Sequence, residues 1–87
     1  DSYSILGYVR DADRLYADVA SYRARVGDTP LRVILRPGFP DAREQRELTA
    51  HVAAAMAAGA AQVDFYNYGM YDDAVLDRIP RALRAGV

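Results

Sequence analysis

Short apolar segments alternate with longer amphipathic ones along the whole chain of 87 residues. Strands are predicted over residues 3–9, 31–36 and 62–68, and helices over 12–26, 41–59 and from 72 onward. Strands that are joined through helices must run parallel, because each crossover returns the chain to the same end of the sheet. The sequence therefore predicts an α/β fold of three parallel β/α units, which fill residues 1–87 as one segment.

Helix start and stop signals support these boundaries. Asp11 can cap the first helix by accepting from exposed amides of its first turn, and Gly27 suits the left-handed position beyond its end. Asp41 is predicted to cap the second helix, with Glu44 three residues later completing a capping box.

The last helix carries two further signals. Asp72 is its predicted N-cap, and Val75, Leu76, Ile79 and Leu83 are predicted to face inward. Pro80 removes a backbone donor, so we expect a kink or break near Ile79.

The two faces of the sheet differ in chemistry. Leu31, Val33 and Leu35 share one face of the second strand, whereas Arg32 and Arg36 flank Ile34 on the other. Asp64 and Tyr66 add polar groups to that second face. An open sheet covered by helices on both faces rarely buries such groups, but the inward face of a (β/α)8 barrel does. We therefore expect the last units of a TIM barrel.

Three units cannot close a barrel, so partner structure is expected. The partner would be the remainder of the barrel or copies of this chain. The alternative is a small three-stranded α/β domain with a free edge on each side, which would invite strand addition.

Composition excludes several function classes. With 52% apolar and 26% charged residues and a net charge of −1, the chain has no basic run for nucleic acid or an anionic membrane. It has no cysteine for a disulfide or a thiolate metal site, and no apolar run approaching the ~20 residues of a membrane span. Composition does not determine the compartment.

Charged residues near the strand ends form the first candidate site. In parallel α/β proteins ligands bind at the carboxyl ends of the strands. We expect Asp64 to lie within ion-pair reach of Arg32 or Arg36 and to point away from the helices. Asp64 is then a candidate catalytic acid–base group, Arg36 a candidate substrate-binding group, or the pair is purely structural.

Aromatic and amide side chains follow the third strand. Tyr66 and Tyr68 can stack on a sugar or another flat ligand face, while Asn67 fixes its orientation. All three are candidate substrate-binding residues. The alternative is that the tyrosines pack as ordinary strand aromatics and Asn67 makes the turn before Gly69.

The remaining residue types predict no cofactor. His51 is the only histidine, lies in mid-helix without a second histidine or cysteine at a metal-binding spacing, and is predicted to be a surface or helix-flank residue. No nucleophile elbow and no glycine-rich phosphate loop occurs in the sequence.

Two passages carry a family resemblance. Residues 30–37, PLRVILRP, and 57–69, AAGAAQVDFYNYG, resemble the carboxy-terminal end of bacterial TIM-barrel proteins of glycoside-hydrolase-like type. The resemblance implies a hydrolase-like parent protein and a carbohydrate as candidate ligand. Many retaining glycosidases place a glutamate at the end of the seventh strand, whereas the matching strand here ends Arg36-Pro37-Gly38.

The sequence thus predicts the carboxy-terminal portion of a hydrolase-like TIM barrel, which binds a polar small molecule at its strand ends. The alternative is a structural or self-associating α/β fragment without catalysis.

Overall fold

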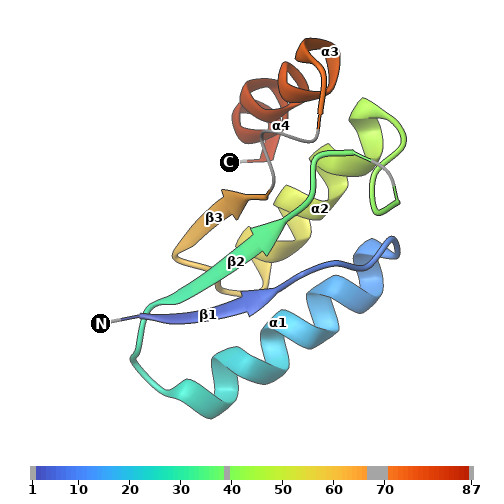
Figure 1. Cartoon of the computed structure of the whole chain (residues 1–87). Helices are drawn as coiled ribbons and strands as arrows, with labels where there is room; N and C mark the ends of the chain where they lie inside the picture. Colours follow the sequence, from blue (N-terminus) through green and yellow to red (C-terminus); the bar gives the residue numbers. More distant parts are fainter. Residues whose placement is uncertain (1, 39, 67–70, 87) are drawn as a thin grey trace.

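The computed structural model describes residues 2–38, 40–66 and 71–86, and consists of three consecutive β/α units (Figure 1). The elements are β1 (Tyr3–Leu6), α1 (Ala12–Val26), β2 (Leu31–Leu35), α2 (Gln45–Ala57), β3 (Gln62–Phe65), α3 (Asp73–Leu76) and α4 (Arg78–Gly86). The predicted strands and helices are all present. Two strands are shorter than the sequence predicts: β1 ends three residues before the predicted end at residue 9, and β2 ends one residue before the predicted end at residue 36.

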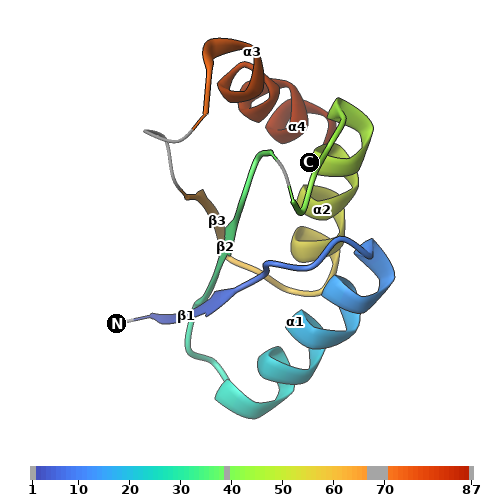
Figure 2. The same ribbon diagram turned by 45° about the vertical axis from the view of Figure 1, so that its right-hand side comes forward.

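The sheet has the strand order β1-β2-β3, and both strand pairs are parallel. Helices α1 and α2 lie on the same side of the sheet, and α4 packs beside α2 (Figure 2). The other face of the sheet carries no helix among the described residues. The α/β class with three parallel units is therefore confirmed, with a single helix layer.

The core lies between the sheet and this helix layer. Leu31, Val33 and Leu35 alternate along β2 with fully buried side chains, as the predicted strand pattern requires. Gly7 follows β1 where space is short, since a Cβ atom there would lie 2.8 Å from Leu15 Cδ1. Side chains of α1 therefore approach the backbone of the β1–α1 loop closely.

Helix α1 has its predicted boundaries. The Asp11 side chain accepts from the Asp13 amide at 2.9 Å, and Leu15 and Val19 are buried against the sheet. Gly27 ends the helix at φ 64°, a left-handed conformation that favours glycine.

The predicted start of α2 is wrong. The helix begins at Gln45, and its capping box joins Glu44 and Glu47 instead of Asp41 and Glu44. Both pairs have the same three-residue spacing, but Asp41 makes an ion pair with Arg36 and is not available as a cap. Residues 41–44 consequently belong to a long β2–α2 loop.

The last helix is interrupted at Asp77, two residues before Ile79, near which Pro80 predicts a break. The Asp72 side chain accepts from the Val75 amide at 3.0 Å and caps α3, which ends before Asp77. Helix α4 restarts at Arg78, so Pro80 lies in the first turn of α4, where an amide proton is not required. Of the residues expected inside, Ile79 is buried, whereas Leu83 is 38% exposed.

Candidate functional site

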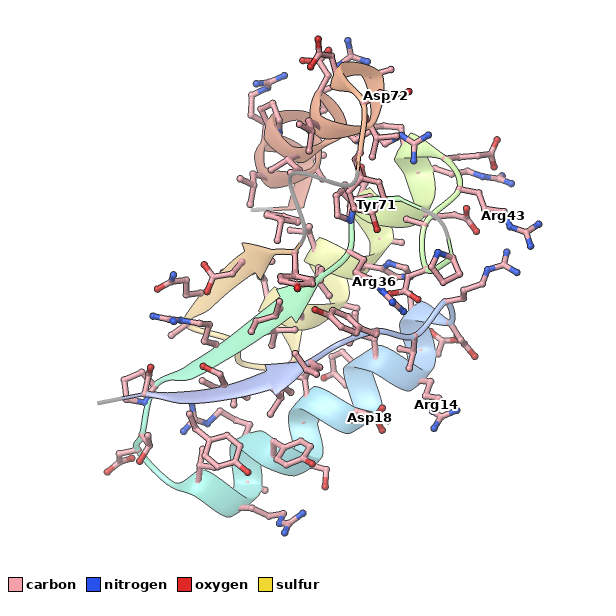
Figure 3. All side chains as sticks on the ribbon, viewed as in Figure 1. Arg14, Asp18, Arg36, Arg43, Tyr71 and Asp72 are labelled. Carbon is pink, nitrogen blue, oxygen red and sulfur yellow. The ribbon has the colours of Figure 1, made fainter. Side chains whose placement is uncertain are left out.

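Polar and aromatic side chains gather at the carboxyl ends of the three strands. The register aligns Leu6 with Ile34 and Ile34 with Asp64, so residues two positions further along each strand come next to one another. These are Tyr8, Arg36 and Tyr66. By strand alternation they share the face that the helices leave uncovered. Figure 3 shows Arg36 and Tyr71 at this end of the sheet.

Arg36 is held by Asp41 in a two-point ion pair. Its Nε donates to Asp41 Oδ2 at 2.6 Å and its Nη2 to Oδ1 at 2.8 Å. The Asp41 side chain is 5% exposed and that of Arg36 29%. The hydrogen bond to Asp41 raises the pKa of Arg36 above its ordinary value. The pair therefore fixes the plane of a guanidinium that still has access to solvent.

The aromatic ring of Tyr8 packs against this guanidinium. The Cζ atom of Arg36 lies 4.2 Å from the centre of the Tyr8 ring, which is a cation–π contact. Burial raises the pKa of the Tyr8 phenol, and the opposing effect of Arg36 is smaller. Tyr8 consequently stays protonated at neutral pH and keeps a hydroxyl that can both donate and accept.

Two further tyrosines lie at the same end of the sheet. Tyr66 is 55% exposed, and its amide donates to the Leu35 carbonyl at 2.9 Å, which continues the sheet beyond β3. Tyr71 is half-buried and packs against Gly38, where a Cβ atom would lie 2.7 Å from the Tyr71 ring. The predicted binding residues Asn67 and Tyr68 lie outside the described residues.

Asp64 has the ion pair that the sequence predicts, but with Arg32 alone. Arg32 Nε lies 3.0 Å from Asp64 Oδ2, and Gln62 Nε2 donates to Asp64 Oδ1 at 2.8 Å. Arg32 and Gln62 are paired with each other in the sheet and lie two residues closer to the amino ends of the strands than Asp64 does. The carboxylate therefore leans away from Arg36, which is paired with Asp41 instead.

The environment of the Arg32–Asp64 pair is half-exposed. Their side chains are 40% and 36% exposed, and Arg32 Nε lacks the geometry of a hydrogen bond despite the short distance. A pair of this kind contributes about 0–1 kcal/mol, because water already solvates both charges. Its catalytic role stays a prediction.

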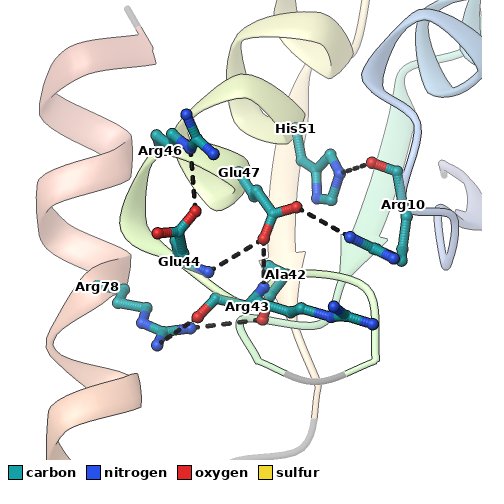
Figure 4. Close-up of polar contacts among 8 residues, drawn as sticks. All are labelled: Arg10, Ala42, Arg43, Glu44, Arg46, Glu47, His51 and Arg78. Carbon is teal, nitrogen blue, oxygen red and sulfur yellow. Dashed lines mark hydrogen bonds and ion pairs between the residues drawn. The ribbon is translucent and has the colours of Figure 1, made fainter.

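His51 is buried, whereas the sequence predicts a surface or helix-flank residue. It is 1% exposed, and its Nε2 lies 2.7 Å from the Arg10 carbonyl oxygen. Because a carbonyl oxygen only accepts, we assign the ring proton to Nε2, which donates this hydrogen bond. The bond ties the β1–α1 loop to α2 (Figure 4). The periodic pattern missed it because this loop folds back over α2 and covers position 51.

Glu47 joins the two loops nearby. Its Oε1 accepts from the Arg43 and Glu44 amides at 2.7 and 3.1 Å, and Arg10 Nη2 lies 3.4 Å from Oε2 (Figure 4). The backbone hydrogen bond from Arg43 is the main cause that lowers the pKa of Glu47. This network holds the start of α2 rather than a ligand.

Other kinds of site are not seen in the described parts of the chain. Within residues 2–38, 40–66 and 71–86 there is no group of three or more side chains suited to hold a metal ion, and no pocket. None of the described helices combines the length and apolar character needed to cross a bilayer. Comparisons with protein-family models, curated proteins and solved structures found no match to this chain.

Sequence reasoning identified Arg36 and Tyr66 as candidates but missed three of their neighbours. The sequence predicts Tyr8 as a strand residue and Asp41 as a helix cap, and Tyr71 stands at the start of the predicted last helix with no sign of a binding role. A signal for Tyr8 was present, since it stands two residues beyond Leu6, as Arg36 stands two residues beyond Ile34, the residue that pairs with Leu6. The Arg36–Asp41 contact depends on the path of the loop, which no periodic pattern encodes.

Proposed function

We propose that this chain provides a small-molecule site at the carboxyl ends of its strands, within a protein of (β/α)-barrel type that resembles hydrolases. Arg36 is the anchor of this site, and Tyr8 and Tyr66 offer it aromatic faces. The observation that carries the proposal is the Tyr8–Arg36–Asp41 arrangement, which orients a partly exposed guanidinium beside a phenol ring. Strand ends are where α/β proteins bind ligands.

The chemistry of this cluster favours a neutral polar ligand. Asp41 compensates the charge of Arg36 and accepts two of its five N–H donors, so further donors can meet hydroxyl or carbonyl oxygens. The exposed Tyr66 ring suits the flat face of a sugar. A multiply charged anion would gain less, because the nearest cation is already neutralised. We therefore favour a carbohydrate or a similar polyhydroxylated molecule.

The arrangement of the elements supports a barrel origin. The strands follow in sequence order, and α1 and α2 lie on one face of the sheet, as in (β/α)8 barrels. The uncovered face carries Leu6, which is 66% exposed, together with the Arg32–Asp64 pair. In a closed barrel this face would be the interior, where Asp64 would be shielded and could act as an acid–base group.

Ligand-observed NMR with a panel of mono- and disaccharides tests the binding proposal. Tyr66→Ala should weaken binding by about 1–3 kcal/mol, which is about 5- to 150-fold, because the ring would no longer cover the ligand. Tyr16→Ala is the matched control, since Tyr16 is similarly exposed but lies on α1. Equal affinity in the wild-type protein, Tyr66→Ala and Arg36→Ala would contradict the site.

Self-association without catalysis is the second candidate, and the sheet edges favour it. Among the described residues, β1 and β3 each pair on one side only, and Tyr3 and Leu6 on β1 are 45% and 66% exposed. Free parallel edges invite strand addition. Sedimentation should then show dimers or larger species that Leu6→Lys weakens, and a monomer at all concentrations would contradict this candidate.

A further inference from the structure

Arg78, the first residue of α4, reaches across to the β2–α2 loop. Its Nη1 donates to the Pro37 and Ala42 carbonyls at 3.3 and 3.4 Å, and its Nη2 donates to the Arg43 carbonyl at 3.0 Å. Figure 4 shows the contacts with Ala42 and Arg43. The Arg78 carbonyl in turn accepts from Gln45 Nε2 at 3.0 Å. One side chain of the third unit thus holds both ends of a loop that belongs to the second.

The same loop carries the anchor of the proposed site. Asp41 immediately precedes Ala42 and is the residue that orients Arg36 through two short hydrogen bonds. Between the two ends the loop is closed by the Ala42 amide, which donates to the Gly38 carbonyl at 3.0 Å. The Ala42 amide belongs to the peptide unit that joins Asp41 to Ala42, whereas the Ala42 carbonyl that Arg78 holds belongs to the next unit, so only the Ala42 Cα atom separates the two. A displacement of the Ala42 carbonyl is therefore passed to Asp41 across a single residue.

The packing leaves the loop few alternatives. Gly38 lies under the Tyr71 ring and beside Val75, so the loop cannot shift in that direction without displacing α3. Asp41 is 4% exposed, so it cannot exchange Arg36 for bulk water while the loop stays closed. The geometry of the Arg36–Asp41 pair consequently depends on the contacts that close the loop, and Arg78 supplies those from α4.

We propose that Arg78 is a positioning residue for Arg36: by holding the carbonyls of the β2–α2 loop it fixes Asp41, and through Asp41 it fixes the guanidinium plane. The meaning of this arrangement for ligand binding rests on the function proposed above. Arg78 itself does not contact Arg36. Its planar fork reaches three carbonyls at once, which a lysine ammonium on a flexible stem would not reproduce.

Hydrogen exchange of the Arg36 Nε–H group tests this directly. In protein labelled with ¹⁵N-arginine, the resonance is identified by its loss in Arg36→Lys, and its exchange with water is measured by NMR. Arg78→Ala should accelerate this exchange at least about tenfold, the change in a local opening equilibrium that follows loss of one hydrogen bond made by a charged group. The Ala42 amide, which donates to Gly38, should accelerate in parallel.

Two comparisons separate positioning from a general loss of stability. The Val33 amide in the buried strand β2 should keep its protection in Arg78→Ala, because only the loop opens. Arg81→Ala is the matched control, since Arg81 is one turn along α4, is 62% exposed, and pairs with Asp77. It should leave Arg36 exchange unchanged. Arg78→Lys keeps the charge and should accelerate Arg36 exchange by less than Arg78→Ala does. It replaces Arg78→Ala in the test if that variant does not fold.

Unchanged Arg36 exchange in folded Arg78→Ala or Arg78→Lys would overturn the proposal. So would acceleration in equal proportion at Arg36 and Val33, because that would show a merely global effect. The measurement uses no ligand. It can therefore fail while saccharide binding persists, and it can succeed even if the proposed ligand class is wrong.

Discussion

The Arg36–Asp41 pair should be asymmetric in its contribution to stability. Asp41 is 5% exposed at its side chain and Arg36 is 29% exposed. Arg36→Met would leave a nearly buried carboxylate without its cation, and removal of one partner of a buried pair costs about 3–5 kcal/mol. Asp41→Asn would leave a guanidinium that can turn toward water and keep one hydrogen bond. We expect it to cost only about 1–2 kcal/mol.

A double-mutant cycle makes this reasoning quantitative. Arg36→Met combined with Asp41→Leu removes both charges from the loop, so the double variant should be more stable than Arg36→Met alone. The coupling free energy between the two positions should be about 2–3 kcal/mol, as for contacting residues in one hydrogen-bonded network. Urea unfolding followed by circular dichroism supplies the four free energies of unfolding.

The matched comparison is the pair of Arg32 and Asp64, whose side chains are both more than one-third exposed. Arg32→Met should cost no more than about 1 kcal/mol, because a solvated pair contributes little. The reasoning is refuted if Arg36→Met costs under about 0.5 kcal/mol, as ordinary surface changes do, or if Asp41→Asn is the more damaging of the two substitutions.

Three further outcomes follow from the site and its supports. Because the pKa of Glu47 is lowered from 4.5, its contribution to stability is present above that pH and is lost as the pH falls below it. In Glu47→Gln the free energy of unfolding, measured with urea, should therefore decrease less as the pH falls below 4.5. Because burial raises the pKa of Tyr8 from 10.0, the contribution of Tyr8 to stability is present below that pH and is lost as the pH rises above it. In Tyr8→Phe the free energy of unfolding should therefore decrease less than in the wild-type protein as the pH rises above 10.0. Gly7→Ala should lower the free energy of unfolding by about 1–3 kcal/mol, since the added Cβ would lie 2.8 Å from Leu15 Cδ1; a neutral effect would show that the loop can retreat from α1.

Local signals predicted much of the fold. Helix α1 could be placed to the residue because its cap at Asp11 and its end at Gly27 act through neighbouring backbone groups. The alternation of Leu31, Val33 and Leu35 likewise identified the buried face of β2. Such features depend on spacing along the chain, so the sequence contains them directly.

Contacts set by loop paths could not be predicted in the same way. Asp41 and Glu44 match a capping box as well as Glu44 and Glu47 do, and only the position of Arg36 in space decides between them. His51 is buried because the loop at Arg10 returns to α2, a tertiary contact between residues far apart in the sequence. The strand-end location of the site was predictable, whereas the partners of its charges were not.

Mapping where small polar molecules bind tests the central claim most directly. In ¹H–¹⁵N NMR spectra recorded with a library of polar fragments that includes sugars, we predict shifts at Tyr8, Arg36 and Tyr66, at the carboxyl ends of the strands. The amino ends, at Thr29 and Ala61, should stay unchanged, because they offer little to orient a polar molecule. Shifts confined to the amino ends or to the outer helix surfaces, or no shift at the carboxyl ends with any fragment, would contradict the account.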